Sequence, residues 1–359
     1  MTRLPETAAS EKPVRTGEPR GLHLYACFVA LATWLLIMAG GMVTSTGSGL
    51  AVPDWPTTYG YNMFTYPYSK WVGGIFYEHG HRLIASTVGM LTIGLWIWLW
   101  KRETRRWLCH LGTVALAAVI FQGILGGLTV RYLLPTPISV AHACLAQTFF
   151  CIVVSIAIFT SSRWKRAMRD HAVMGAPRWQ TPHLGIALVA VVFGQLLLGA
   201  GMRHTESGLA VTDFPLAYGQ VIPDLSDSAL ERYNDQRRFE LLLPVVTAGQ
   251  IRLHMAHRIG AVAVAIVAVV VCAAILRRHR GVSALRISAW LILALLVVQM
   301  AMGAWTVLSE KQPVIATAHV AIGAAILGIS WAMTLWSYRT VGVARRQSLP
   351  AAAIVGAAG

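Results

Sequence analysis

The sequence predicts an all-α integral membrane protein with eight transmembrane helices, arranged as two pseudo-symmetric, parallel four-helix bundles. Three observations support this fold class: an apolar composition, eight long stretches without charged residues, and an internal repeat that relates the two halves of the chain. Of the 359 residues, 56% are hydrophobic and 13% are charged, which argues against a soluble globular protein.

Each predicted span is free of Asp, Glu, Lys and Arg and is long enough to cross a bilayer as a helix. The cores of the spans are rich in Leu, Ile, Val and Ala, and they lack the alternation of membrane β-barrel strands. In chain order, the spans are residues 21–53, 83–100, 107–130, 132–162, 179–202, 259–276, 287–309 and 312–338.

The basic residues predict the orientation of these helices. With eight spans, both termini lie on the same side of the membrane as three Arg-rich loops. That side holds 20 of the 30 basic residues and 5 of the 15 acidic ones, so it carries the whole net charge of +15. The positive-inside rule makes this side cytoplasmic. Topology and contact with anionic lipids explain the charge, and no nucleic-acid partner is expected.

The N-terminal twenty residues are polar, contain three Glu and lack the apolar segment of a signal peptide. We therefore expect a multi-pass protein of a bacterial inner membrane with both termini in the cytoplasm.

An internal repeat divides the chain into two halves. Residues 40–60 match residues 199–219 at 11 of 21 positions without a gap. Each half contains four spans, so the halves are expected to be parallel copies, each forming a four-helix bundle. The predicted organisation is a cytoplasmic tail, an N-terminal bundle, a cytoplasmic linker, a C-terminal bundle and a second tail, at residues 1–21, 22–162, 163–182, 183–338 and 339–359. The polar stretch at 231–240, in the longer second outer loop, is expected to form a short surface helix.

Four histidines occupy matching places in the repeat, with His81 aligned to His257 and His142 aligned to His319. Each lies near the outer end of its span, within roughly two turns, a depth of about 10 Å. Two imidazoles at one depth on two helices are what a six-coordinate haem iron requires. A lone membrane histidine is often only an interhelical hydrogen-bond donor, but four at symmetric positions predict metal ligation, because polar groups in spans are usually functional.

The two halves differ beside these histidines. Glu78 lies three residues before His81, on the same helix face, whereas the second half has His254 at the equivalent place. Glu78 is therefore the candidate catalytic residue, able to transfer protons or stabilise positive charge; the alternative is a carboxylate that complements a helix N-terminus. Arg82 and Arg258 follow the two aligned histidines, and they either pair with haem propionates or extend to the membrane interface.

The outer-loop motifs "GSGLAVPDWP" and "ESGLAVTDFP" combine Gly, Pro and an aromatic residue with a single Asp. Either Trp55 and Phe214 lie on a macrocycle, or the loop folds against the mouth of the bundle for shape alone. Gln122 and Gln299 lie beside small residues at helix-packing spacing and are expected to form packing hydrogen bonds.

Together these motifs resemble the haem A synthase family. The resemblance rests on "GSGLAVPDWP", "EHGHR", "AHACLAQ", "HMAHRIGA" and "ATAHVAIGA", and it extends from residue 22 to residue 338. It implies an oxidoreductase that oxidises a methyl group of haem O to a formyl group, giving haem A for terminal oxidases. Some members carry a cysteine pair in an outer loop; all five cysteines of this chain lie in or beside apolar spans, so it resembles the cysteine-free subgroup.

The resemblance also implies a division of labour between the halves. His257 and His319 would ligate haem b, and His81 and His142 would hold the substrate haem O or the product haem A, near the periplasmic face. Glu78 falls at the position of the family's functionally important glutamate. The implied partners are haem O synthase, cytochrome oxidase assembly factors and membrane lipids, with a homo-oligomer left open.

Two other classes of protein fit the same histidines. A dihaem b-type electron-transfer protein would use both pairs without needing Glu78. A haem carrier would pass haem to an oxidase without altering it.

Overall fold

The computed structural model describes residues 20–169 and 180–347, and most of this part of the chain is helical. Eight of its helices are long and apolar enough to cross a membrane, which confirms the predicted all-α class with eight candidate membrane helices. The pseudo-symmetric arrangement of two parallel bundles stays a prediction. They are α1 Gly21–Ser45, α2 Gly74–Arg102, α3 Arg106–Arg131, α4 Thr136–Thr160, α6 Gln180–His204, α8 Ala248–Arg278, α9 Ser283–Leu308 and α10 Pro313–Gln347. Much of the two predicted tails and the centre of the predicted linker lie outside the described residues.

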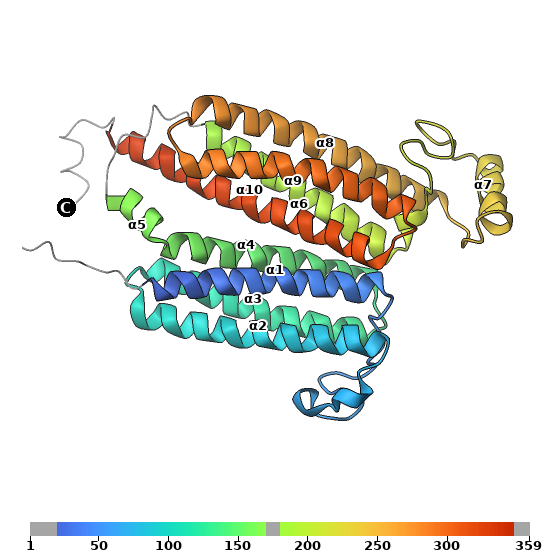
Figure 1. The fold of residues 1–359 in the computed structure, drawn as a ribbon, viewed down its shortest axis with the longest axis horizontal. Helices are drawn as coiled ribbons and strands as arrows, with labels where there is room; N and C mark the ends of the chain where they lie inside the picture. Colours follow the sequence, from blue (N-terminus) through green and yellow to red (C-terminus); the bar gives the residue numbers. More distant parts are fainter. Residues whose placement is uncertain (1–19, 170–179, 348–359) are drawn as a thin grey trace, which may run out of the picture.

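The membrane helices form two groups that lie side by side (Figure 1). In the first group α1 contacts α2 and α4, and α3 contacts the same two helices. In the second group α6 contacts α8 and α10, and α9 contacts these two in turn. The groups meet where α1 and α4 pack against α10 and where α4 packs against α6. Each group has its own apolar core, centred on residues such as Leu99 and Phe149 in the first and Ile275 and Ile292 in the second.

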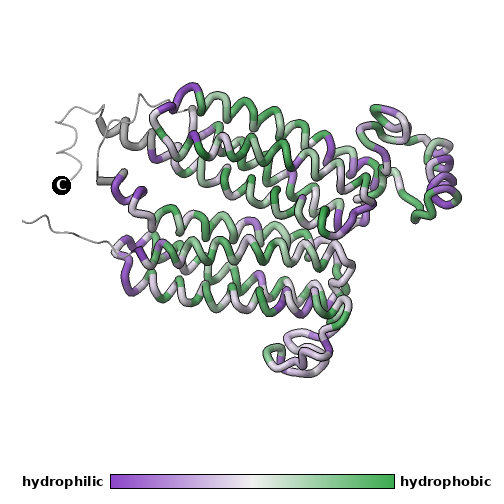
Figure 2. Tube along the Cα trace, in the orientation of Figure 1, coloured by the Kyte–Doolittle hydropathy of each residue, from purple (hydrophilic) through white to green (hydrophobic). Residues whose placement is uncertain are grey.

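The connections differ between the two ends of the helices. The end at which α1 begins and α10 ends has short links and the small helix α5 (Ser162–Arg169). The opposite end, called the loop end here, bears the long segments 46–73 and 205–247. Colouring by hydropathy shows apolar helix centres with polar residues gathered at both ends (Figure 2). The predicted surface helix is confirmed as α7 (Asp227–Phe239), which lies at the loop end.

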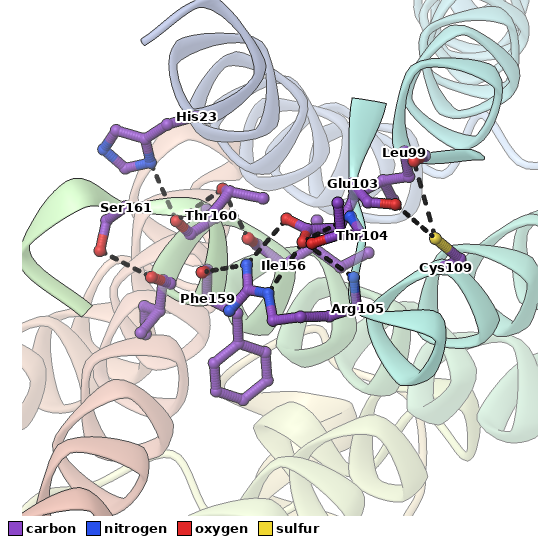
Figure 3. Close-up of polar contacts among 12 residues, drawn as sticks. His23, Leu99, Glu103, Thr104, Arg105, Cys109, Ile156, Phe159, Thr160 and Ser161 are labelled. Atoms are coloured by element: carbon purple, nitrogen blue, oxygen red, sulfur yellow. Dashed lines mark hydrogen bonds and ion pairs between the residues drawn. The ribbon is translucent and has the colours of Figure 1, made fainter. Parts of the chain in front are cut away.

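A small polar cluster closes the first group at the end opposite the loop end (Figure 3). The Arg105 guanidinium donates to both carboxylate oxygens of Glu103, at 2.9 and 2.8 Å, and to the carbonyl of Phe159 at 2.9 Å. Burial alone would raise the pKa of Glu103, but the hydrogen bonds and charge of Arg105 hold that pKa below its ordinary value. The cluster therefore ties the α2–α3 turn to the end of α4.

Two helices begin further out than their charge-free stretches. α2 starts at Gly74 rather than at residue 83, and α8 starts at Ala248 rather than at residue 259. Glu78 and Arg82 in the first extension and Arg258 in the second have hydrogen-bond partners in the outer loops, so these charged residues do not end the helices. α8 also has a reciprocal cap, in which the Thr247 hydroxyl accepts from the Gln250 N–H and the Gln250 side chain accepts from the Thr247 N–H.

Candidate metal centres in the two helix groups

The structure brings the four predicted histidines together in two pairs. His257 of α8 and His319 of α10 face each other with ring centroids 6.4 Å apart and ring planes at 72°. Rings that each place a nitrogen about 2 Å from one shared metal have centroids roughly 6 Å apart, so this spacing matches joint ligation. In the first group His81 of α2 and His142 of α4 occupy the equivalent positions, each against a glycine of a neighbouring helix.

Every one of these imidazoles lies against a glycine of the neighbouring helix. In each case the ring edge that carries Cε1 and both nitrogens faces the glycine, and the four contacts repeat between the two groups. A Cβ built on the glycine would lie 3.1 Å from Cε1 of the histidine in Gly40–His81 and Gly199–His257, and 3.2 Å in Gly126–His142 and Gly303–His319. Any larger residue would push the ring aside. The glycines thus determine how closely each imidazole approaches the neighbouring helix.

The ring nitrogens are incompletely paired. The buried Nδ1 atoms of His81, His142 and His319 have no hydrogen-bond partner. Buried polar atoms are nearly always paired, so these nitrogens point to a group that the protein itself does not supply. Two imidazoles per helix group in apolar surroundings fit the axial ligation of a haem iron.

Glutamine amides fix the backbone beside two of the histidines. Gln122 of α3 donates to the carbonyl of His142 at 3.0 Å, which confirms the packing bond expected there. Gln195 of α6 donates to the carbonyl of His257 at 2.8 Å, and its amide nitrogen lies 3.0 Å from Nδ1 of the same histidine. The histidine-bearing helices are therefore held in register with their neighbours at the level of the imidazoles.

Glu78 and Arg82 form a buried pair at the outer edge of the first centre. Glu78 is 4% exposed; its Oε1 accepts from Arg82 Nη2 at 2.6 Å and its Oε2 accepts from the Val52 N–H at 2.7 Å. Arg82 also donates to the carbonyls of Val52 and Asp54, at 2.8 and 2.7 Å. The pair anchors the outer loop on the first turns of α2.

The second centre has the same framework with one exchange. His254, 2% exposed, replaces Glu78, and its Nδ1 lies 3.3 Å from the Val211 N–H. Arg258 donates to the carbonyls of Asp213 and Leu216, at 2.6 and 2.9 Å. Both arginines therefore hold loop carbonyls, and the groups differ by a carboxylate in the first against an imidazole in the second.

The outer-loop motif forms a closed turn in both halves. Asp54 accepts from the N–H groups of Tyr59 and Gly60, at 2.7 and 2.9 Å, and Asp213 makes the equivalent bonds at 2.8 and 2.9 Å. The Trp55 ring packs against Gly127 at the end of α3, where a Cβ would lie 2.5 Å from the indole. These contacts favour a loop folded for shape; placement of Trp55 or Phe214 on a macrocycle stays a prediction.

His79 takes no part in the first centre. Its ring is buried against Trp71 and Tyr66, with ring centroids 4.6 and 5.0 Å away, and its Nδ1 lies 3.1 Å from the Thr58 hydroxyl. It therefore faces the outer loop.

The sequence analysis missed three sets of residues that the structure places at the centres: the four glycines, Gln195, and Arg203 in the last turn of α6. The signal for the glycines was present, because the aligned repeat begins at Gly40 and Gly199. Gln195 and Arg203 gave no such signal. Leu36 and Thr44 occupy their places in the first half, so repeat alignment passes over them.

Comparison with known proteins adds a family. The COX15-CtaA family model, described as cytochrome oxidase assembly protein, matches residues 23–331. A protein of Halalkalibacterium halodurans called heme A synthase is 26% identical over 312 residues, which cover 84% of this chain and 92% of that protein. A heme A synthase of Caulobacter sp. is 26% identical over a match that covers 91% of this chain and 98% of that protein. A heme A synthase of Symbiobacterium thermophilum is 29% identical over a match that covers 75% of this chain and 80% of that protein.

Proposed function

The chain belongs to the COX15-CtaA family of cytochrome oxidase assembly proteins, and on this premise we propose that it is a haem A synthase. It would oxidise the methyl group of haem O to the formyl group of haem A. The observation that carries the proposal is the pair of like centres that differ by one carboxylate, Glu78 against His254. Relatives called heme A synthase that match this chain over most of their length support it.

The two centres have separate tasks in this proposal. His257 and His319, whose spacing suits a shared metal, hold haem b, which supplies one-electron chemistry when bound. His81 and His142 bind and orient the substrate haem O. The apolar helices around both centres exclude water.

Glu78 is the residue proposed to hold or transfer a proton at the substrate. Its carboxylate lies one helical turn from His81 on the same face of α2 and is kept in place by Arg82 and the Val52 N–H. A positioned carboxylate in a site closed to water suits general acid–base catalysis. Arg82 and Arg258 are proposed to bind porphyrin propionates with donors beyond those used on the loops.

The proposed setting is a bacterial inner membrane, with the loop end at the periplasmic face. The concentration of basic residues on the opposite side supports this orientation. Haem O synthase would supply the substrate, and oxidase assembly would consume the product.

Pigment analysis tests the proposal. Cells that make this protein together with haem O synthase are expected to accumulate haem A, measured by chromatography of extracted haems. Pigment that remains only haem B and haem O would reject the enzyme and favour an electron-transfer protein or a haem carrier. Cells with haem O synthase alone provide the control.

Replacement of Glu78 tests its role. Glu78→Gln retains an oxygen that can accept from the Val52 N–H but removes the charge and the transferable proton. We expect haem A yield to fall by roughly 100-fold or more, while haem O and haem b remain bound. The matched variant is His254→Gln, at the equivalent place in the second half, which should leave haem A yield near normal. Normal yield from Glu78→Gln would remove this residue from the mechanism.

A further inference from the structure

Arg203 lies between the two helix groups with most of its hydrogen-bonding capacity unused. Its Nη2 donates to the carbonyl of Gly41 in α1 at 2.9 Å and contacts the Ser45 hydroxyl, which lies 3.2 Å from the hydroxyl of Thr317 in α10. In the part of the chain that the structure describes, only Nη2 has protein partners. No carboxylate among those residues lies within ion-pair distance of Arg203.

A partly buried arginine with unused N–H donors is suited to bind an anion. A guanidinium offers five N–H donors in a planar fork, and a partly buried charge without a partner in an apolar region is unfavourable. Its place at the end of α6 gives some compensation from the helix dipole. Helix packing does not require the charge. In α1, the equivalent of α6, the same place is occupied by Thr44, whose hydroxyl donates to the carbonyl of Gly40 in its own helix.

The position of Arg203 links it to the second centre. It lies four residues beyond Gly199, the glycine that faces His257, so both residues share one face of α6. Arg258, the arginine expected at this centre, already donates both terminal amino groups to loop carbonyls. On Arg203, by contrast, Nε and Nη1 have no protein partners among the described residues.

We propose that Arg203 binds a carboxylate of the porphyrin held by His257 and His319. This inference rests on the proposed function and adds a residue to its haem b site. The planar fork matches a carboxylate in a two-point contact. A phospholipid headgroup presents an anion of similar chemistry, so the test must separate the two sources.

The test compares haem with its dimethyl ester, which keeps the iron and the ring but has no negative charge. Full-length protein depleted of haem is titrated with each compound in neutral detergent, and binding is followed by the Soret band. We expect the wild type to bind haem roughly 10- to 100-fold more tightly than the ester. Arg203→Met should bring the two affinities together, and Arg203→Lys should restore part of the difference. The control is Arg252→Met, an exposed arginine near the start of α8, which should discriminate like the wild type.

The possible outcomes separate the explanations. Undiminished discrimination by Arg203→Met overturns the inference. An equal loss of haem and ester binding overturns it as well, because Arg203 would then only hold the helix groups together. If the wild type shows no discrimination and Arg203→Met instead reduces co-purified anionic phospholipid, the anion is a lipid. Wild-type protein that binds neither compound rejects the proposed function along with this inference.

Discussion

At the scale of single residues, the contact between glycine and imidazole is the feature that most constrains the centres. Four glycines on four helices face four histidines at nearly equal distances. Such close approach leaves each ring little freedom to move toward its neighbouring helix. The position of each ligand is thus set by a residue without a side chain.

Substitution of Gly199 tests this constraint. In Gly199→Ala the new Cβ would lie 3.1 Å from Cε1 of His257, so the ring must move by a few tenths of an ångström from the position it has here. Overpacking of this kind typically destabilises by about 1–3 kcal/mol, which corresponds to a roughly 5- to 150-fold weaker affinity. The measurement is haem b retained per protein after purification.

Gly201→Ala is the matched control, because nothing lies within 4 Å of a Cβ at Gly201 on the same helix. It should retain haem at the wild-type level. Equal retention in both variants would show that Gly199 does not position His257.

The same scale shows what sequence could predict. His81, His142, His257 and His319 were identifiable because both their type and their symmetric spacing carry information. Gly199 was visible only as a repeated residue, since a close contact depends on the distance between helices. Arg203 could not be predicted, because the absence of a carboxylate beside it among the described residues is a property of three-dimensional packing.

At the scale of elements, the outer loops and the helices beneath them depend on one another. Arg82 and Arg258 reach back to loop carbonyls, and this pairing lets α2 and α8 extend past their charge-free stretches. Sequence predicted the existence of these helices and misplaced their starts, because charge alone does not show whether a polar residue is paired. Within each loop, Asp54 and Asp213 likewise pair with backbone N–H groups and hold the turn closed.

Asp54 makes the first loop sensitive to acid. Burial alone would raise its pKa, but hydrogen bonds from Gly60, Thr57 and Tyr59 hold the pKa below the ordinary value of 3.8. The folded loop favours the carboxylate, so this stabilisation is present above pH 3.8 and is lost as the pH falls through the lower folded-state pKa. Hydrogen exchange of residues 50–62, corrected for the intrinsic rate, should accelerate in that acidic range.

Asp54→Asn should accelerate this exchange already at neutral pH, because one amide oxygen replaces two charged acceptors. Bonds to a charged group contribute about 1.5–3 kcal/mol, which sets the scale of the effect. Asp235→Asn, an exposed residue of α7, should leave the loop unchanged. An Asp54→Asn loop that exchanges like the wild type at pH 7 would contradict the role given to this carboxylate.

At the scale of the whole molecule, two similar helix groups carry unequal centres. Both have a histidine pair, glycine contacts and a closed aspartate turn. They differ in Glu78 against His254, in Gln195 against Leu36, and in Arg203 against Thr44. The first group has the extra carboxylate, and the second has the extra amide and cation. This pattern suits a first centre that reacts and exchanges its porphyrin, and a second centre that retains one.

Histidine replacement in each group tests that asymmetry. His319→Ala removes one ring of the pair with centroids 6.4 Å apart, so the purified protein should lose its b-type absorbance. His81→Ala leaves that pair intact; it should retain the b-type spectrum and lose haem A formation. The second variant also controls for folding, since both remove one half-buried imidazole from equivalent places in the repeat. Loss of b-type absorbance in His81→Ala together with its retention in His319→Ala would reverse the assignment of the centres, because the resident haem would then belong to the group that contains Glu78.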